Sequence, residues 1–175
     1  MAYNRKAACF VTAIAMVAAL FLGAWGSFAA DRRGAVAVFD ADILPHMDRA
    51  IVAAFNVHTV AANYLSAAET ARFGIADIVA NIQNADDPAD VHAQYILLYN
   101  AVWDVYEMLA ARDVSDANRD FINIYHRNFN EVDLILRQAG YNNDAGDFNT
   151  ALTGGGNLGF LVRFVVDEMP RFDAD

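Results

Sequence analysis

The sequence has one cysteine, four glutamates and few basic residues, and each shortage limits what the protein can be. Cys9 has no second cysteine with which to form an internal disulfide, so cysteine usage does not settle the compartment. None of the four glutamates stands three residues before a histidine, which excludes the Glu-x-x-His pattern of carboxylate-bridged di-iron bundles. Strand-type alternation and glycine-turn hairpins are also missing, so the chain is predicted to be helical throughout.

The shortage of Lys and Arg makes the chain acidic. Its formal net charge is -10, from 12 basic and 22 acidic residues. Four of the basic residues and one acid lie before residue 34, so residues 34–175 carry 8 basic and 21 acidic residues, a net charge of -13. Such a surface repels polyanions. A nucleic-acid partner is therefore not expected.

Apolar residues, by contrast, are abundant, and one uncharged run stands out near the N-terminus. They make up 57% of the chain, against about 45–50% in ordinary globular domains. From Ala7 to Ala30 there is no charged residue, and at a rise of about 1.5 Å a helix of this length covers a hydrocarbon core of about 30 Å. Trp25 stands near its end, where an interfacial aromatic would sit. Residues 1–34 are predicted to be a membrane anchor.

A cleaved signal peptide is the alternative for this run. Ser27-Phe28-Ala29 has the small-x-small pattern of a cleavage site, and cleavage there would leave Ala30 at the mature N-terminus. Signal h-regions are only about 7–15 residues long, so the length favours the anchor. Two basic residues flank the run on each side, so the positive-inside rule leaves the orientation open.

Two helices are predicted between residues 47 and 111. The first is a heptad-like seam over 47–82, with Gly74 as its weak point. Asp87 and Pro88 then suit the N-cap and first position of a helix over 89–111. One stripe of that helix holds Val91, Tyr95, Leu98, Val102, Val105 and Leu109. A second stripe beside it holds His92, Ile96, Tyr99, Trp103 and Tyr106.

The segment from Asp113 to Thr150 is predicted to be one long amphipathic helix with Ser115 as its N-cap. Its apolar positions recur at three- and four-residue steps, which predicts a core-facing stripe. The stripe consists of Phe121, Tyr125, Val132, Ile135 and Ala139.

An aromatic-Asn pair occurs twice in this segment, as Tyr141-Asn142 and Phe148-Asn149. Seven residues are two helical turns, so both pairs share one face. Buried, the amides would bond to a neighbouring helix and fix its register. Exposed, the pairs would form a recognition stripe. The buried interpretation is favoured.

These motifs resemble the LemA family. The likeness is carried by Ala117, Asn118, Phe121, Glu131, Leu134, Tyr141, Asn142, Asp147, Phe148, Asn149 and Thr150, with Ala41-Asp42-Ile43-Leu44-Pro45 and Glu69-Thr70-Ala71-Arg72 upstream. They are similar to the family's Ala-Asn, Phe, Glu-x-x-Ile and Tyr-Asn-x-x-Val-x-x-Tyr-Asn-Thr pattern. The resemblance spans residues 41–172 and implies a membrane-anchored helical bundle.

The predicted fold is therefore all-α. An N-terminal transmembrane helix is followed by an antiparallel up-and-down bundle of three long helices and a short C-terminal helix over 158–166, with residues 35–175 forming the bundle domain.

Catalytic chemistry is not predicted. Ser66 and Ser115 lie on no strand-to-helix elbow, and Gly154 to Gly156 is interpreted as a hairpin rather than an anion cradle. Haem between His58 and His92 is geometrically conceivable, but a histidine on an apolar seam is more often a core residue. The sequence thus predicts no enzyme, cofactor or metal site.

The leading hypothesis is a single-pass, membrane-tethered, non-enzymatic scaffold or structural component of a membrane-associated assembly. Its expected partners are the lipid bilayer and other proteins of the membrane or assembly, a second copy included. The rival hypothesis is a secreted or periplasmic helical bundle, released by signal cleavage, that binds a small ligand or haem.

Overall fold

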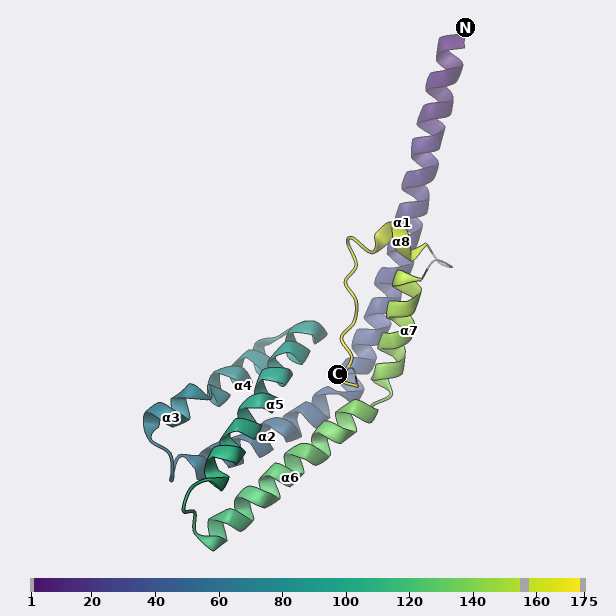
Figure 1. Ribbon diagram of the computed structural model, residues 1–175. Helices are drawn as coiled ribbons and strands as arrows, with labels where there is room; N and C mark the ends of the chain where they lie inside the picture. The colour runs from purple at the N-terminus through teal and green to yellow at the C-terminus, as the bar shows by residue number, and fades with distance from the viewer. Residues whose placement is uncertain (1, 155–157, 174–175) are drawn as a thin grey trace. The chain divides into compact units, whose positions relative to one another are not determined.

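The computed structural model describes residues 2–154 and 158–173, with side chains from residue 7 onward. All regular elements in these ranges are helices, which confirms the predicted all-α class. They are α1 (Ala2–Asp42), α2 (Leu44–Ala61), α3 (Ala67–Arg72), α4 (Ile75–Asn84), α5 (Pro88–Ala110), α6 (Asp116–Gln138), α7 (Tyr141–Thr153) and α8 (Gly159–Val162) (Figure 1). The chain divides into two compact units, residues 1–37 with 143–169 and residues 38–142 with 170–175.

Helix α1 contains the uncharged run and is long and apolar enough to span a bilayer. Every side chain from residue 7 to residue 20 is exposed. The next turns are different, because Ala24 and Phe28 are buried and the Phe28 ring meets the Phe148 ring edge-on at 6.1 Å. The helix continues past the predicted anchor boundary at residue 34 and ends at Asp42.

The single helix predicted over residues 47–82 is wrong, because the chain forms α2, α3 and α4 there. Ser66 and Glu69 form a reciprocal capping box that starts α3. The Ser66 amide donates to Glu69 Oε2 at 2.8 Å, and the Glu69 amide donates to Ser66 Oγ at 3.2 Å. Gly74 then takes a left-handed conformation, with φ of 60°, at the start of α4. These local signals interrupt the apolar seam.

The core of the larger unit lies between α2, α4, α5 and α6, with α2 packed along α6 and α4 along α5 (Figure 1). Alanines in α2 let neighbouring helices approach closely, and Ala50 and Ala54 have no exposed surface. The first predicted stripe of α5 is buried at all six positions. In the second stripe, Ile96 is exposed rather than packed, while the other four residues are half-buried.

The core stripe predicted within residues 113–150 is confirmed at Val132 and Ala139, which are buried, but not at its other three positions. Phe121 is 49% exposed, and Tyr125 and Ile135 are only half-buried. The side that faces the core carries Ile122, His126, Phe129, Val132 and Leu136. This side packs mainly along α2, and its Phe129 ring also lies 6.3 and 6.0 Å from the rings of Tyr95 and Tyr99 on α5.

The long helix predicted from Asp113 to Thr150 is also wrong, because it breaks at Ala139 and Gly140. Ala139 has extended backbone angles and ends α6. A new helix starts at Tyr141, whose amide donates to Asp42 Oδ2 at 3.0 Å. A carboxylate at this place satisfies an amide that has no partner within its own helix, and it interacts favourably with the helix dipole. The break is therefore stabilised from a distant part of the chain.

Candidate functional site

The first aromatic-Asn pair lies in the larger unit and is buried. Asn142 Nδ2 donates to the carbonyl oxygens of Leu136 and Arg137 at 2.8 and 3.0 Å, and Asn142 Oδ1 accepts from the Phe172 amide at 2.8 Å. The two carbonyls belong to the last turn of α6, where backbone acceptors lack helical partners. Asn142 thus caps α6 and holds the C-terminal segment with the same side chain.

Tyr141 supports this arrangement from the same unit. Its hydroxyl donates to the Pro170 carbonyl at 2.9 Å, and its ring meets Phe39 edge-on at 5.2 Å. The side chain has no exposed surface. A buried tyrosine whose hydroxyl is hydrogen-bonded contributes apolar contact and a fixed orientation together.

The second pair lies in the smaller unit. Asn149 and Met169 form a reciprocal pair, in which Asn149 Nδ2 donates to the Met169 carbonyl at 2.8 Å and the Met169 amide donates to Asn149 Oδ1 at 2.7 Å. The amide side chain therefore matches the donor and acceptor of one backbone residue, as a strand partner would. Phe148 is buried against Phe28.

The sequence predicts that both asparagine amides bond to a neighbouring helix, but their hydrogen-bond partners are different. They are backbone groups of the C-terminal segment and of the end of α6. Tyr141, Asn142 and Phe148 are buried and Asn149 is half-buried, so the four side chains do not form an exposed recognition stripe. The two asparagine side chains hydrogen-bond to backbone groups and so fix the position of the C-terminal segment.

A second polar cluster lies between α5 and α6, around His126. The Tyr106 ring stacks on the imidazole at 3.8 Å, and the Trp103 ring meets it edge-on at 4.4 Å. Asn130 Nδ2 lies 3.5 Å from His126 Nδ1, while His126 Nε2 is buried without a hydrogen-bond partner among the described residues. Burial lowers the pKa of His126, because the charged imidazolium is poorly solvated there.

We expect acid to destabilise the protein through this histidine. The folded-state pKa lies below the unfolded value of about 6.5, so the unfolded state binds the proton more readily, and stability falls as the pH drops through this range. Urea unfolding between about pH 7.5 and 5.5 should show a smaller loss of stability in His126→Phe than in the unsubstituted chain. Burial also lowers the pKa of His92, so part of the loss should remain. Equal pH slopes in the two proteins would contradict the prediction.

A charged network also ties α5 to α6. Tyr95 donates through its hydroxyl to Asp133 Oδ1 at 2.7 Å, and Arg137 Nε donates to Asp133 Oδ2 at 2.9 Å. Burial and the bond to Asp133 raise the pKa of Tyr95, which keeps the phenol a neutral donor. The network is satisfied within the protein and presents no free nucleophile.

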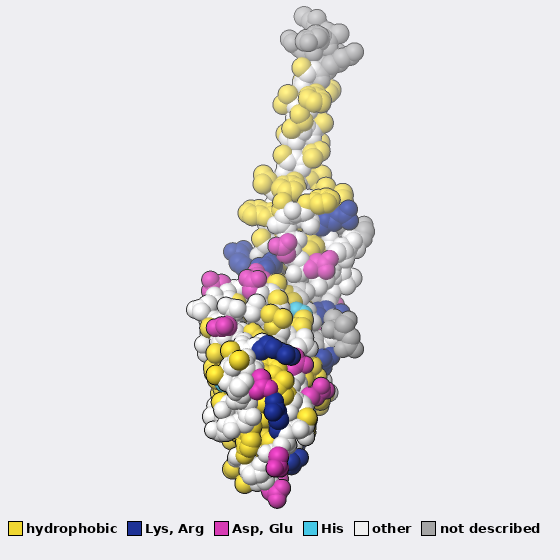
Figure 2. All heavy atoms as spheres, turned by 60° about the vertical axis from the view of Figure 1, so that its left-hand side comes forward, with side chains coloured by type: hydrophobic (Ala, Val, Ile, Leu, Met, Phe, Trp, Pro, Cys, Tyr) yellow, Lys and Arg dark blue, Asp and Glu magenta, His cyan; other side chains and the backbone are white. Residues whose placement is uncertain are grey.

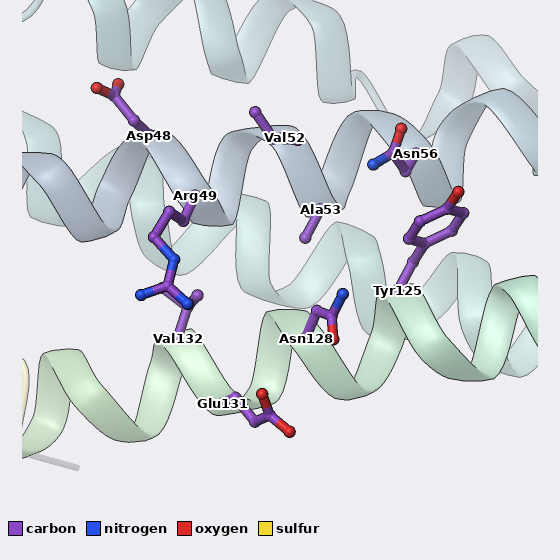
Figure 3. A pocket seen from close by; sticks show the side chains of 9 residues that line it. All are labelled: Asp48, Arg49, Val52, Ala53, Asn56, Tyr125, Asn128, Glu131 and Val132. Carbon is purple, nitrogen blue, oxygen red and sulfur yellow. The ribbon is translucent and has the colours of Figure 1, made fainter.

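One surface groove of about 420 Å³ lies between α2 and α6 (Figure 3). It is lined by Asp48, Arg49, Val52, Ala53, Asn56, Tyr125, Asn128, Glu131 and Val132. The lining mixes charges of both signs with amides and small apolar groups, and it contains no serine, cysteine or histidine. The groove therefore has no serine or cysteine nucleophile and no histidine base, and its ionisable side chains are Asp48, Arg49, Tyr125 and Glu131. The sequence did not point to it, because its residues come from the sides of two separate helices.

The other residues considered from the sequence have structural contacts. Ser66 forms the capping box of α3, whereas Ser115 makes no capping bond and its Oγ lies 3.1 Å from the Tyr64 hydroxyl. His58 lines a pocket with residues of α3 and α4, and His92 meets the Phe172 ring edge-on at 4.9 Å. The two histidines thus have different surroundings.

Ligand-type side chains do not gather elsewhere in the part of the chain that the structure describes. No group of three or more His, Cys, Asp or Glu residues lies close enough there to hold a metal ion. In the glycine run, Gly155 and Gly156 lie outside the described residues.

Comparisons with protein-family models, curated proteins and solved structures found no match for this chain.

Proposed function

We propose that the chain is a membrane-tethered, non-enzymatic helical scaffold that serves a membrane-associated assembly. The observation that carries the proposal is the surface of α1, whose residues 7–20 are all exposed and uncharged. A contiguous apolar surface of this size is unusual in water and typical of a membrane or protein contact. In a helix every backbone polar group inside the span is already bonded, as a bilayer requires. The LemA-like motifs agree with such a tether.

The packing of Phe28 favours a retained anchor over a cleaved signal. Cleavage after Ala29 would remove Phe28 and leave Phe148, its edge-on partner, uncovered. It would also remove Ala24, another buried residue of α1. Intact mass of the protein from all fractions of the native cells, membrane and soluble, tests this directly. A mature chain that begins at Ala30 would overturn the tether and favour a secreted binding protein.

Charges placed in the middle of α1 should release the protein from membranes. A single Arg at the centre of a span costs about 2.5–3.5 kcal/mol on insertion scales, so Ile14→Arg with Val17→Arg should shift much of the protein to the soluble or degraded fraction. Carbonate extraction followed by immunoblotting measures this shift.

The matched control is Val52→Arg. Val52 lies on α2 and is 60% exposed, against 62% for Val17, so the same substitution is made on an equally open side chain. It should leave the protein in the membrane pellet. Quantitative recovery of the unsubstituted chain in the detergent-free soluble fraction would refute the proposal.

A further inference from the structure

The chain after α7 carries a second exposed apolar surface, which we call the α8 patch. It consists of Leu158, Phe160, Phe164 and Val165. Phe164 is 80% exposed and Phe160 is 51% exposed, although both belong to a segment that is otherwise packed on the protein. Four exposed apolar side chains within eight residues make a more continuous apolar surface than single exposed residues do, and such surfaces are typical of a contact site.

The other side of the same segment is tightly packed, so the patch is held in place. Val162 has no exposed surface, and Gly159 and Val166 are buried. A Cβ atom at Gly159 would lie 2.3 Å from the Leu152 carbonyl oxygen and 2.6 Å from that of Ala151, so only glycine allows α8 to approach the end of α7 this closely. One side of residues 158–166 therefore faces protein, while the other presents the patch.

The packing of α7 on α1 places the patch at the start of the open surface of α1. Both helices belong to the smaller unit here, and α7 runs antiparallel to α1 (Figure 1). Phe148 lies opposite Phe28, so the end of α7, about 7.5 Å further on, is level with roughly Gly23. Just beyond this level α1 becomes fully exposed, and Trp25 is exposed beside it.

The chemistry at this level is that of a lipid interface. Aromatic rings collect at the boundary between headgroups and acyl chains, and arginines extend toward the headgroups. The Arg163 guanidinium lies over the Phe164 ring, 5.0 Å from its centroid. Figure 2 shows hydrophobic side chains along the open part of α1 and a broader group of them at its base, with Lys and Arg side chains next to that group.

We propose that the α8 patch is a second membrane contact, whose apolar side chains enter the interfacial region of the bilayer that α1 crosses. The inference rests on the proposed tether. A transmembrane helix alone leaves its domain free to rotate about one point, whereas a second contact beside it fixes the smaller unit against the membrane surface. The patch thus gives the smaller unit a defined orientation on the bilayer.

Depth-dependent quenching in the full chain tests the proposal. The protein is reconstituted into phosphatidylcholine vesicles that contain lipids with a doxyl quencher near the headgroup end of the acyl chain. A bimane label is placed at Val165→Cys in a Cys9→Ala background. A label on the native Cys9 reports the tether separately, and Asn100→Cys, on the exposed side of α5, is the control for water.

The proposal expects quenching at positions 9 and 165 and none at position 100. Quenching at Cys9 without quenching at 165 would overturn the membrane contact of α8 and leave the tether standing. Without quenching at Cys9, both the tether and the inference fall. A signal at 165 that responds to the protein-to-lipid ratio but not to doxyl lipid would indicate a second copy on the patch, and would also overturn the inference.

A substitution pair then tests the rings themselves. Phe160→Ser with Phe164→Ser should abolish most of the acyl-chain quenching at position 165, while Cys9 remains quenched in its own background. Phe121→Ser is the matched control, because Phe121 is 49% exposed on α6 and lies outside the patch. Unchanged quenching at 165 after loss of both rings would contradict insertion of the patch.

Discussion

Replacing Phe129 by alanine is expected to lower the free energy of unfolding by about 3–5 kcal/mol, the range found for large buried aromatic side chains. Phe129 has no exposed surface, and the rings of Tyr95 and Tyr99 lie against it from α5. The substitution leaves a cavity that the surrounding helices fill only in part. Urea unfolding of the full chain in nonionic detergent, followed by circular dichroism, measures the loss.

Phe121→Ala is the matched control for this prediction. It removes the same side chain from the same helix, but from a position that is about half exposed. We expect a cost of less than about 1 kcal/mol there. Equal losses at the two positions would mean that α6 faces the core with both stripes, and that the observed orientation of the helix is wrong.

Replacing Asn142 by alanine is expected to destabilise the protein by about 2–4 kcal/mol. The substitution removes the partner of two α6 carbonyls and of the Phe172 amide, and each buried polar group left unpaired costs about 1–3 kcal/mol before water or relaxation repairs part of it. The C-terminal segment should also become accessible. Protease digestion under native conditions should therefore cut it sooner in the variant.

The neighbouring Asn143 provides the control. It is the same residue type, one position further along α7, and it is exposed. Asn143→Ala should change the stability by no more than about 0.5 kcal/mol and leave the protease pattern as it was. A small effect at Asn142 would show that its three hydrogen bonds are replaced easily by water.

The sequence predicted the elements that depend on one strong local pattern. The uncharged run appears as α1, and Asp87 with Pro88 starts α5 as expected. All six positions of the first stripe of α5 are buried, because one helix period with large apolar residues leaves little choice of face.

The breaks within helices were missed although each had a local signal. The start of α3 had a readable signal, since Ser66 followed three residues later by Glu69 is a capping-box pattern. The break at Ala139 and Gly140 also had a readable signal, since a glycine after an arginine in the last turn is typical of a helix end, but the contact with Asp42 that starts α7 could not be read from the sequence. Periodicity alone predicts one continuous helix across such a break, because the apolar residues on both sides still recur at three- and four-residue steps.

Part of the core face of α6 was missed because its composition is ambiguous. Phe121 and Tyr125 look like core residues, whereas His126 looks polar. The structure buries His126 because Tyr106 and Trp103 provide a flat, polarisable surface for the imidazole. The burial of His126 therefore depends on α5, which the sequence of α6 alone does not show. For the aromatic-Asn pairs, the shared helix face allowed burial to be predicted. It gave no sign that their hydrogen-bond partner would be the C-terminal segment.

The bond between the Asp42 carboxylate and the Tyr141 amide has a consequence for biogenesis. During synthesis the carboxylate leaves the ribosome long before its partner, and closing so long a loop carries an entropic penalty that shorter contacts avoid. The helices between these residues can therefore assemble first, and α7 gains its proper start only when that assembly holds Asp42 in position. The start of α7 is therefore expected to form late in folding, once residues 42 and 141 of the larger unit have met.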